Sequence, residues 1–338
     1  MRVSIGVFLL FASPALAASQ SDVVHHQLDV SLDPATSTLT ATDTVTVPRA
    51  VAKDGIRFQL NKDLTVRSLS DGITIEKVGD VVGSCDVGMD RGDGGPASRI
   101  EAVSYQVNGA PKSGDVTFSV AIEGVVDYKI AQVRVDYDRG FSESPGMIEE
   151  RGTYLAGSTC WTPNIPGTLI TYDLEVTMPG DWRSVSQGAR TETDLVNGTR
   201  RDNWAATKPT EEVHVIAAPF TEYAYDAGAV TAMAFLRTPD EELADRYLEA
   251  TAQYLDMYRD MFGPYPYTKF ALVENFWETG YGMPSFTLLG SQVIRFPFIL
   301  HSSYPHELLH NWWGNGVFVD FASGNWCEGL TSYLADHL

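Results

Sequence analysis

The chain has 338 residues, 44% of them hydrophobic, and a formal net charge of −20 at neutral pH. This length is more than one compact core usually holds, so we expect two domains. The negative charge disfavours nucleic-acid phosphates and anionic membrane surfaces as partners. No internal run reaches the roughly 18 to 20 apolar residues of a transmembrane helix, so stable membrane insertion is not expected. The oligomeric state is left open.

Residues 1–17 have the pattern of a secretory signal peptide. Arg2 precedes a short apolar core, Val3–Ala12, and Ala15–Ala17 supplies a cleavage site of small residues. We therefore expect an exported protein, periplasmic or secreted, whose mature chain begins near Ala18.

The chain contains three cysteines, too few for a disulfide framework. One pair can close in an oxidising compartment, and we expect that pair to be Cys85 and Cys160. Cys327 is expected to be buried, because it adjoins a candidate metal ligand, Glu328.

Residues 18–225 consist of short runs in which apolar and polar side chains alternate. Alternation with a period of two is typical of half-buried strands, and Gly, Pro, Asn and Asp separate the runs. The pattern predicts an all-β, sandwich-like domain. The expected strands are 27–32, 39–47, 116–122, 132–137, 168–178 and 213–218.

Two further segments of this region are predicted to be turns. Gly83–Pro96 is rich in Gly and Asp but lacks the ligand spacing of a calcium loop, so we interpret it as a solvated turn. Asn197-Gly198 is typical of a β-hairpin turn, although with Thr199 it also fits a glycosylation acceptor.

Residues 226–338 change to a helical period and predict an α+β domain. Thr238 is a plausible helix N-cap with Pro239 at the first position, and the helix is expected to end at Gly263. A buried strand, a Gly-rich segment, a second strand and another helix are expected to follow, at 270–273, 280–283, 285–289 and 304–316.

The most informative motif lies in the last of these helices. His306 and His310 are four residues apart, so on a helix both imidazoles lie on one face and can reach one ion. Glu307 is rotated by about 100° from His306 and can face a water beside that ion, where a general base belongs. Catalytic zinc keeps three protein ligands, and Glu328 is available as the third. The motif predicts one Zn²⁺ per chain, although such a site also accepts other first-row metals.

Together these residues resemble the membrane alanyl aminopeptidase (aminopeptidase N) family of gluzincin zinc metallopeptidases. The match consists of the family's H-E-x-x-H-x-W-x-G-N motif at 306–315, its E-G motif at Glu328-Gly329, and the Phe262–Pro266 segment. The resemblance is specific over residues 240–338. It implies an N-terminal β-saddle, a thermolysin-like catalytic domain, zinc bound by His306, His310 and Glu328, and peptide hydrolysis by a metal-activated water.

Two departures from the family pattern concern ligands and specificity. The family usually places 18 residues between the second His and the ligand Glu, whereas 17 separate His310 and Glu328, with Asp320 as the fallback carboxylate. Asp320 is also a candidate hydrogen-bond partner for the histidines.

The family's exopeptidase motif G-x-M-E-N aligns with a segment that contains Gly282, Met283 and Pro284. These residues are expected to bind substrate, but Pro284 stands where the family has the Glu that holds the α-amine. Glu274 and Glu278 are the alternatives for that charge. An aminopeptidase is therefore one interpretation, and an endopeptidase or other zinc hydrolase is another.

A third departure lies at the end of the chain. The chain ends at Leu338, ten residues after Glu328, within a predicted helix that has no stop signal. It resembles a truncated family member that lacks the downstream Tyr and helical domain. A non-catalytic peptide-binding protein on a peptidase scaffold is the remaining alternative. For these residues alone, zinc binding with weak or no turnover is expected.

Overall fold

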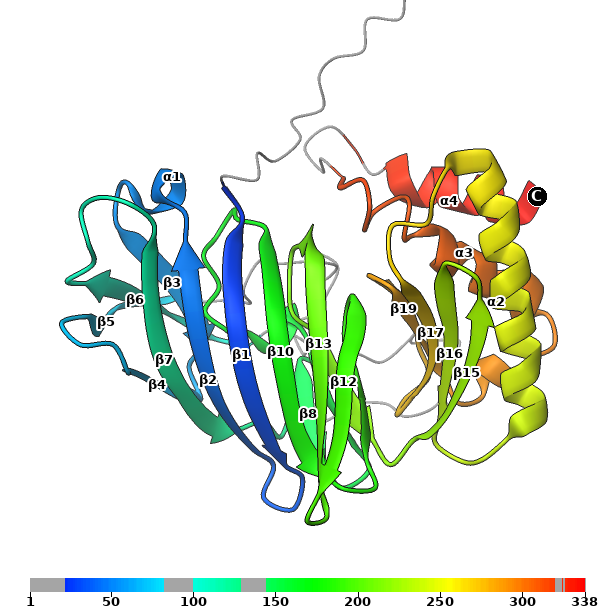
Figure 1. The fold of residues 1–338 in the computed structure, drawn as a ribbon, viewed down its shortest axis with the longest axis horizontal. Coiled ribbons are helices and arrows are strands. Elements are labelled where there is room, and N and C mark those ends of the chain that lie inside the picture. The colour runs from blue at the N-terminus through cyan, green and yellow to red at the C-terminus, as the bar shows by residue number, and fades with distance from the viewer. Residues whose placement is uncertain (1–21, 82–99, 129–143, 320–323, 325, 338) are drawn as a thin grey trace, which may run out of the picture.

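The computed structural model describes residues 22–81, 100–128, 144–319, 324 and 326–337. Within them the fold is mostly β, with four sheets. Figure 1 shows the larger β-rich part and, beside it, a smaller sheet covered by helices. The expected strand at 132–137, the Gly83–Pro96 segment and Cys85 lie outside the described residues.

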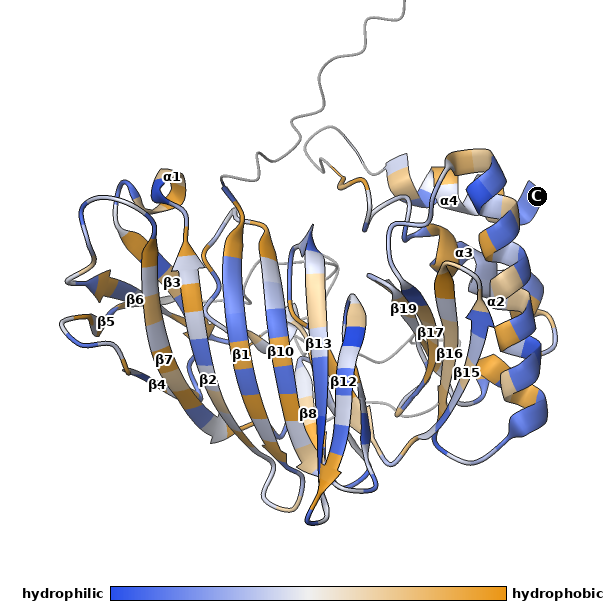
Figure 2. Cartoon of the chain, in the orientation of Figure 1, coloured by the Kyte–Doolittle hydropathy of each residue, from blue (hydrophilic) through white to orange (hydrophobic). Residues whose placement is uncertain are grey.

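A seven-stranded sheet forms the centre of the β-rich part. Its order is β12-β13-β10-β1-β2-β7-β4, with β1 and β10 parallel. The exposed and buried residues of β1 alternate along the strand, as the sequence predicts, and Figure 2 shows the same banding. The strands are β1 (Val24–Asp33), β2 (Thr38–Val47), β4 (Leu64–Ser68), β7 (Val116–Val125), β10 (Ile170–Pro179), β12 (Ala189–Val196) and β13 (Thr199–Thr210).

The β12–β13 hairpin turns at Asn197 and Gly198, whose φ angles are 53° and 79°. Positive φ at both central residues is the geometry for which Asn-Gly is preferred, so the hairpin prediction is confirmed.

Two smaller sheets complete the β-rich part. The four-stranded sheet runs β11-β14-β9-β8 and the three-stranded sheet runs β3-β6-β5. The expected strand at 213–218 is confirmed in a shorter form, as β14. These elements are β3 (Ile56–Asn61), β5 (Thr74–Val81), β6 (Ala102–Asn108), β8 (Gly146–Glu149), β9 (Gly152–Leu155), β11 (Arg183–Val185), β14 (Val215–Ala218), the short helix α1 (Arg49–Ala52) and the 3₁₀ turn η3 (Gly157–Thr159).

The last sheet has five strands in the order β15-β16-β17-β19-β18, which makes β18 an edge strand. Every residue of β17 and β19 is buried, because the sheet packs on α2 on one side and on the β-rich part on the other. Strand β15 pairs with β16, so the change of sheet falls between Ala218 and Thr221. The strands are β15 (Thr221–Ala227), β16 (Val230–Leu236), β17 (Lys269–Asn275), β18 (Gly280–Met283) and β19 (Phe286–Gly290).

The helices differ from the prediction at their ends. The N-cap of α2 is Asp240, not Thr238, because the Asp240 carboxylate accepts the N–H of Leu243. The helix stops before its C-cap, Gly263, which agrees with the predicted end. α3 stops at Leu309 rather than at residue 316. The chain continues in tighter turns, in which Asn311 and Trp312 donate their N–H groups to carbonyls three residues back, and it reverses at Gly314, whose φ is 107°. The helical elements are α2 (Glu241–Phe262), η4 (Val293–Arg295), η5 (Ile299–His301), α3 (Ser303–Leu309) and α4 (Trp326–His337).

Two other expectations can be compared with the described residues. No helix among them combines the length and hydropathy needed to span a membrane. Cys327 is buried and free.

Candidate metal centre

His306, His310 and Glu328 converge at the meeting of α3 and α4. The two imidazole Nε2 atoms are 3.0 Å apart. The Glu328 carboxylate oxygens lie 3.3 Å from each of these nitrogens. Elsewhere among the described residues, no second group of three His, Cys, Asp or Glu side chains brings its ligand atoms this close together.

This triangle has the dimensions that zinc requires. Zinc–nitrogen bonds of 2.0 to 2.1 Å in a tetrahedron place neighbouring ligand atoms about 3.3 Å apart. The three measured separations, 3.0, 3.3 and 3.3 Å, are close to that edge length. Two imidazole Nε2 atoms and a carboxylate all present lone pairs to the same point, and a cation at that point would be stabilised by all three. The residues present therefore fit a three-ligand zinc site.

The protonation of these side chains is consistent with a site that exchanges a proton for a metal. Burial lowers the pKa of His310, which favours the neutral, metal-binding form. Burial also disfavours charge on His306, but the hydrogen bond with Glu328 and neighbouring carboxylates raise its pKa overall. The same hydrogen bond lowers the pKa of Glu328.

The orientation of His310 is fixed by a backbone carbonyl that follows the helix. Its Nδ1 lies 3.1 Å from the carbonyl oxygen of Trp313, which sets Nδ1 as the donor and leaves Nε2 for the metal. The Cys327 thiol donates to the same oxygen at 3.1 Å. The partner proposed from sequence, Asp320, lies outside the described residues. The early end of α3 is what brings Trp313 back to this position.

Glu307 lies against the edge strand β18, next to the candidate metal ligands His306 and His310. Burial raises its pKa to about 7, although the charge of His306 opposes that shift. A Cβ atom added to Gly282 would lie 2.6 Å from Glu307 Oε2, and 3.1 Å from both Cβ and Cδ2 of His310. Gly282 therefore lets the strand approach the carboxylate closely, and Glu307 has the pKa of a general base that works near neutral pH.

Two side chains after the helix hold β18 in this position. Asn315 Nδ2 donates to the carbonyl of Gly282 at 3.3 Å, and Asn311 Oδ1 accepts the N–H of Ser285 at 2.6 Å. Pro284 and Ser285 form the turn between β18 and β19, since Met283 pairs with Phe286. The edge strand is thus bonded to the segment that directly follows α3.

Ser285 is the point at which three parts of the chain meet. Its φ is 70°, as the second central residue of a Pro-led type II turn requires. Its Oγ is 2.7 Å from Lys269 Nζ on β17 and accepts the N–H of Gly188, in the β-rich part, at 3.0 Å. Lys269 is only 3% exposed, and burial lowers the pKa of its amine well below the usual value.

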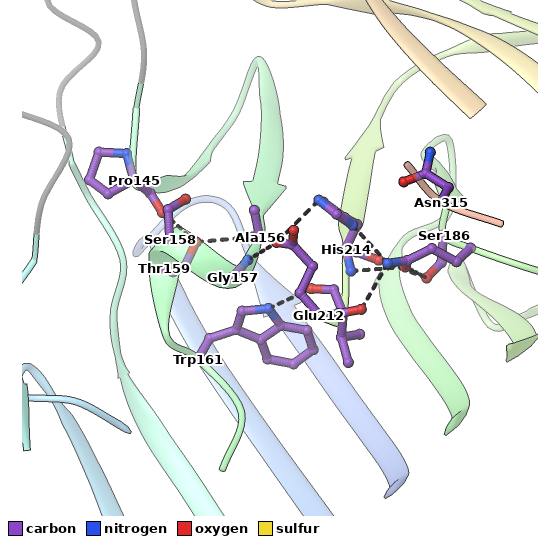
Figure 3. Close-up of polar contacts among 12 residues, drawn as sticks. Pro145, Ala156, Gly157, Ser158, Thr159, Trp161, Ser186, Glu212, His214 and Asn315 are labelled. Carbon is purple, nitrogen blue, oxygen red and sulfur yellow. Dashed lines mark hydrogen bonds and ion pairs between the residues drawn. The ribbon is translucent and has the colours of Figure 1, made fainter. Parts of the chain in front are cut away.

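The segment that reaches Ser285 from the β-rich part is supported by the buried polar network in Figure 3. His214 lies 2.8 Å from Gln187 Nε2 and 3.4 Å from Glu212. Glu212 also accepts the N–H of Gly157, and Ser186 donates to the carbonyl of His214. The network satisfies buried polar groups and fixes the chain immediately before Gly188.

The two carboxylates considered as replacements for the amine-binding Glu are engaged elsewhere. Glu274 accepts from the N–H of Arg237 and from the guanidinium of Arg295, both at 2.8 Å. Glu278 accepts from the N–H groups of Gln292 and Val293 at the start of η4. Both are at least 95% buried, so their charges are used within the fold.

Comparisons with known proteins show likeness at the level of the fold. The M1 zinc metallopeptidase of Deinococcus radiodurans is 18% identical over 87% of this chain, with a TM-score of 0.52. A mutant of that enzyme bound to a Tyr-Ser-Ala substrate gives 16% identity over 87% of this chain, with the same TM-score. The present chain spans 64% of the length of those solved chains. The fold therefore resembles part of an M1 zinc metallopeptidase.

Sequence comparison adds no assignment to this likeness. No protein-family model matches the sequence. No curated protein matches it either.

Sequence reasoning did not identify Ser285 and Lys269 as parts of the site. Lys269 has no motif around it. Ser285 follows Pro284 in the segment aligned with the exopeptidase motif, but its contacts with Lys269 and Gly188 exist only in the folded chain. Asn311 is different. It follows His310 directly, so its place next to the metal ligands is a signal that the sequence offered.

Proposed function

We propose that this protein is a zinc-dependent peptidase that hydrolyses peptide bonds. The observation that supports it best is the convergence of His306, His310 and Glu328 at separations of 3.0 to 3.3 Å, with Glu307 next to them. The M1-like fold is consistent with the proposal. We assign the five-stranded sheet and the helices after Ala218 to a thermolysin-like catalytic domain.

The side chains have separate roles in this mechanism. His306, His310 and Glu328 would hold the metal, which when bound supplies a Lewis acid that polarises the scissile carbonyl and acidifies a water. Glu307 takes the proton of the attacking water and then delivers it to the leaving amine. Its pKa of about 7 suits both transfers. Asn315 and Asn311 hold β18 against Glu307, and β18 is the sheet edge along which an extended peptide can lie.

The first experiment compares wild type with Glu307→Gln. We expect about one zinc per chain in both proteins and peptide hydrolysis in the wild type alone, because Gln retains the shape of the base without its proton affinity. Zinc in both proteins with hydrolysis in neither would point instead to a peptide-binding protein on a peptidase scaffold. Hydrolysis by both proteins would contradict the role of Glu307.

The mode of cleavage needs a separate comparison. An aminopeptidase needs an anion for the substrate's α-amine, but Pro284 is uncharged, and Glu274 and Glu278 are bound within the fold. These observations favour an enzyme that also accepts blocked N-termini. Equal cleavage of acetylated and free peptides is the expected result, and strict dependence on a free amine would support the aminopeptidase assignment. Export to the periplasm or beyond remains a proposal based on residues 1–17.

A further inference from the structure

A cavity of about 300 Å³ lies between the β-rich part and the loops of the five-stranded sheet, next to Pro284. We call it the Pro284 pocket. Its walls are the chain at Gln187–Ala189, the segment Ala205–Lys208 of β13, and the turn Pro266–Thr268. It is separate from the metal site, and Gln187 is the residue that it shares with the polar network described above.

The pocket is lined by Pro284, in the turn that ends the edge strand next to Glu307. Gly282 faces Glu307, and Pro284, in the turn that follows β18, comes two residues later, so it lies no more than about 7 Å away. A second route of contacts leads to the same place, since Asn315 donates to the carbonyl of Gly282 and accepts from the hydroxyl of Tyr267, a wall residue. A peptide that lies along β18 beside Glu307 therefore reaches the pocket after about two residues.

The chemistry of the walls determines what the pocket can hold. No Asp or Glu lines it, and its only charged side chain is Lys208, which is exposed. The remaining lining is Gly, Ala, Pro, Thr, Gln and one Tyr. An α-ammonium group would find no counter-charge here, whereas an aliphatic or aromatic group would be removed from water. The volume is sufficient for a side chain of the size of Leu or Phe, because a cavity of about 150 Å³ already holds benzene.

We propose that the Pro284 pocket is a substrate subsite, which receives an uncharged apolar side chain or N-terminal acyl group about two residues from the bond that is cut. This proposal rests on the proposed peptidase function and names the substrate class for it: peptides with an apolar residue or blocking group at that distance. Ser285 maintains the subsite, because its contacts with Gly188 and Asn311 join one wall of the pocket to the metal helix.

The test uses acetylated peptides of Ala in which one Leu is moved along the chain. We expect Leu at a single position, two residues from the cut bond, to raise kcat/KM about tenfold over Ala at that position. The same position should strengthen binding to the zinc-loaded Glu307→Gln variant, measured by calorimetry. Equal effects of Leu at every position would overturn the subsite.

Variants that fill the pocket make the test specific. Ala189→Leu should abolish the preference for Leu, whereas Asp194→Leu, on an exposed part of the same strand, should retain it. Thr268→Trp, on the opposite wall, is a second variant in case Ala189→Leu does not fold. An unchanged preference in a folded pocket variant would also overturn the proposal. Binding that depends on the position of Leu, without hydrolysis, would refute the peptidase function and support the subsite. Hydrolysis that does not depend on the position of Leu would support the peptidase function and refute the subsite.

Discussion

The backbone N–H of Ser285 donates to Oδ1 of Asn311 at 2.6 Å, and this bond joins the turn after β18 to the residue that follows His310. Both residues are fully buried. The edge strand that lies against Glu307 is therefore positioned by the same segment that supplies two of the proposed metal ligands. A disturbance of the turn should reach the metal site through this contact.

Asn311→Ala tests this connection. The variant leaves the Ser285 N–H without a partner in a buried position, which costs about 1–3 kcal/mol. We expect a fall of that size in the free energy of unfolding, measured with urea, and a lower kcat. Asn108→Ala, which removes an amide that bonds the exposed Glu76, is the control and should change stability by less than about 0.5 kcal/mol. Equal effects of the two variants would show that the Asn311 contact is not important.

Gly282→Ala should separate activity from metal binding. The added methyl would lie 2.6 Å from Glu307 Oε2, so the carboxylate or the strand must move. A displacement of about 1 Å near reacting atoms can reduce the rate about 100-fold, and we expect a loss of that order in kcat/KM with zinc content retained.

Gly280→Ala is a matched control for that variant. Its Cβ would be 3.5 Å from Glu307 Oε1, an ordinary contact. Activity should therefore be close to that of wild type. If both glycine variants were equally active, close approach of the strand at Gly282 would not matter for catalysis.

The parts of the site that sequence predicted are those set by local periodicity. The four-residue spacing of His306 and His310 places their imidazoles together whether the helix ends at Leu309 or at residue 316, so the error in its length did not affect the ligand pair. The alternation in β1 likewise predicted a strand with one buried face. The length of α3 and the N-cap of α2 depended on a turn at Gly314 and on competition between Thr238 and Asp240, which a single sequence resolves poorly.

The support around the site was not predictable in the same way. Three residues that are distant in the chain, Lys269, Ser285 and Gly188, meet because the five-stranded sheet packs against the β-rich part. A buried lysine at the start of a strand gives no sequence signal, since lysine at that position is usually exposed. The position of Glu278 was equally hidden, because its partners are backbone N–H groups of η4.

Removal of the metal should destabilise the protein. The ligand atoms of His306, His310 and Glu328 are all electron-pair donors that lie close together in the folded chain. A cation that binds them binds the folded state and not the unfolded state, so it stabilises the fold by mass action. We expect chelation to lower the unfolding temperature and added zinc to restore it. Zinc affinity should decrease as the pH falls through the pKa of His306, which the hydrogen bond with Glu328 and nearby carboxylates raise above its ordinary 6.5, because the imidazole must lose a proton to bind. Glu328→Ala should remove most of the response to zinc, whereas an equal response in that variant would exclude Glu328 as a ligand.

Glu307→Gln should stabilise the metal-free protein at high pH. The pKa of Glu307 is raised from 4.5 to about 7, so the folded state binds the proton more tightly than the unfolded state. The free energy of unfolding therefore decreases as the pH rises from about 4.5 through 7, and above that range the whole loss caused by burying the charged carboxylate is present. We expect Gln to increase the free energy of unfolding by roughly 1–3 kcal/mol at pH 8 and by little at pH 4.5. The exposed Glu249→Gln is the control, and a pH-independent effect of Glu307→Gln would contradict this account.

Lys269→Met tests the buried amine that contacts Ser285. Burial, with a contribution from Arg190, lowers the pKa of Lys269 well below 10.5, so the unfolded state binds more protons between the lowered pKa and 10.5. The stability that the wild type derives from this group therefore rises with pH across that window and is smallest at its acidic end. Methionine has a similar length but no charge, and it also loses the bonds to Ser285 at 2.7 and 3.1 Å. We expect the stability of Lys269→Met relative to wild type to decrease steadily from pH 7 to pH 10 in urea unfolding experiments, while the exposed Lys112→Met shows no such trend. A difference that stays constant with pH would mean that Lys269 titrates alike in the folded and unfolded chains, and its role would then be limited to the hydrogen bonds.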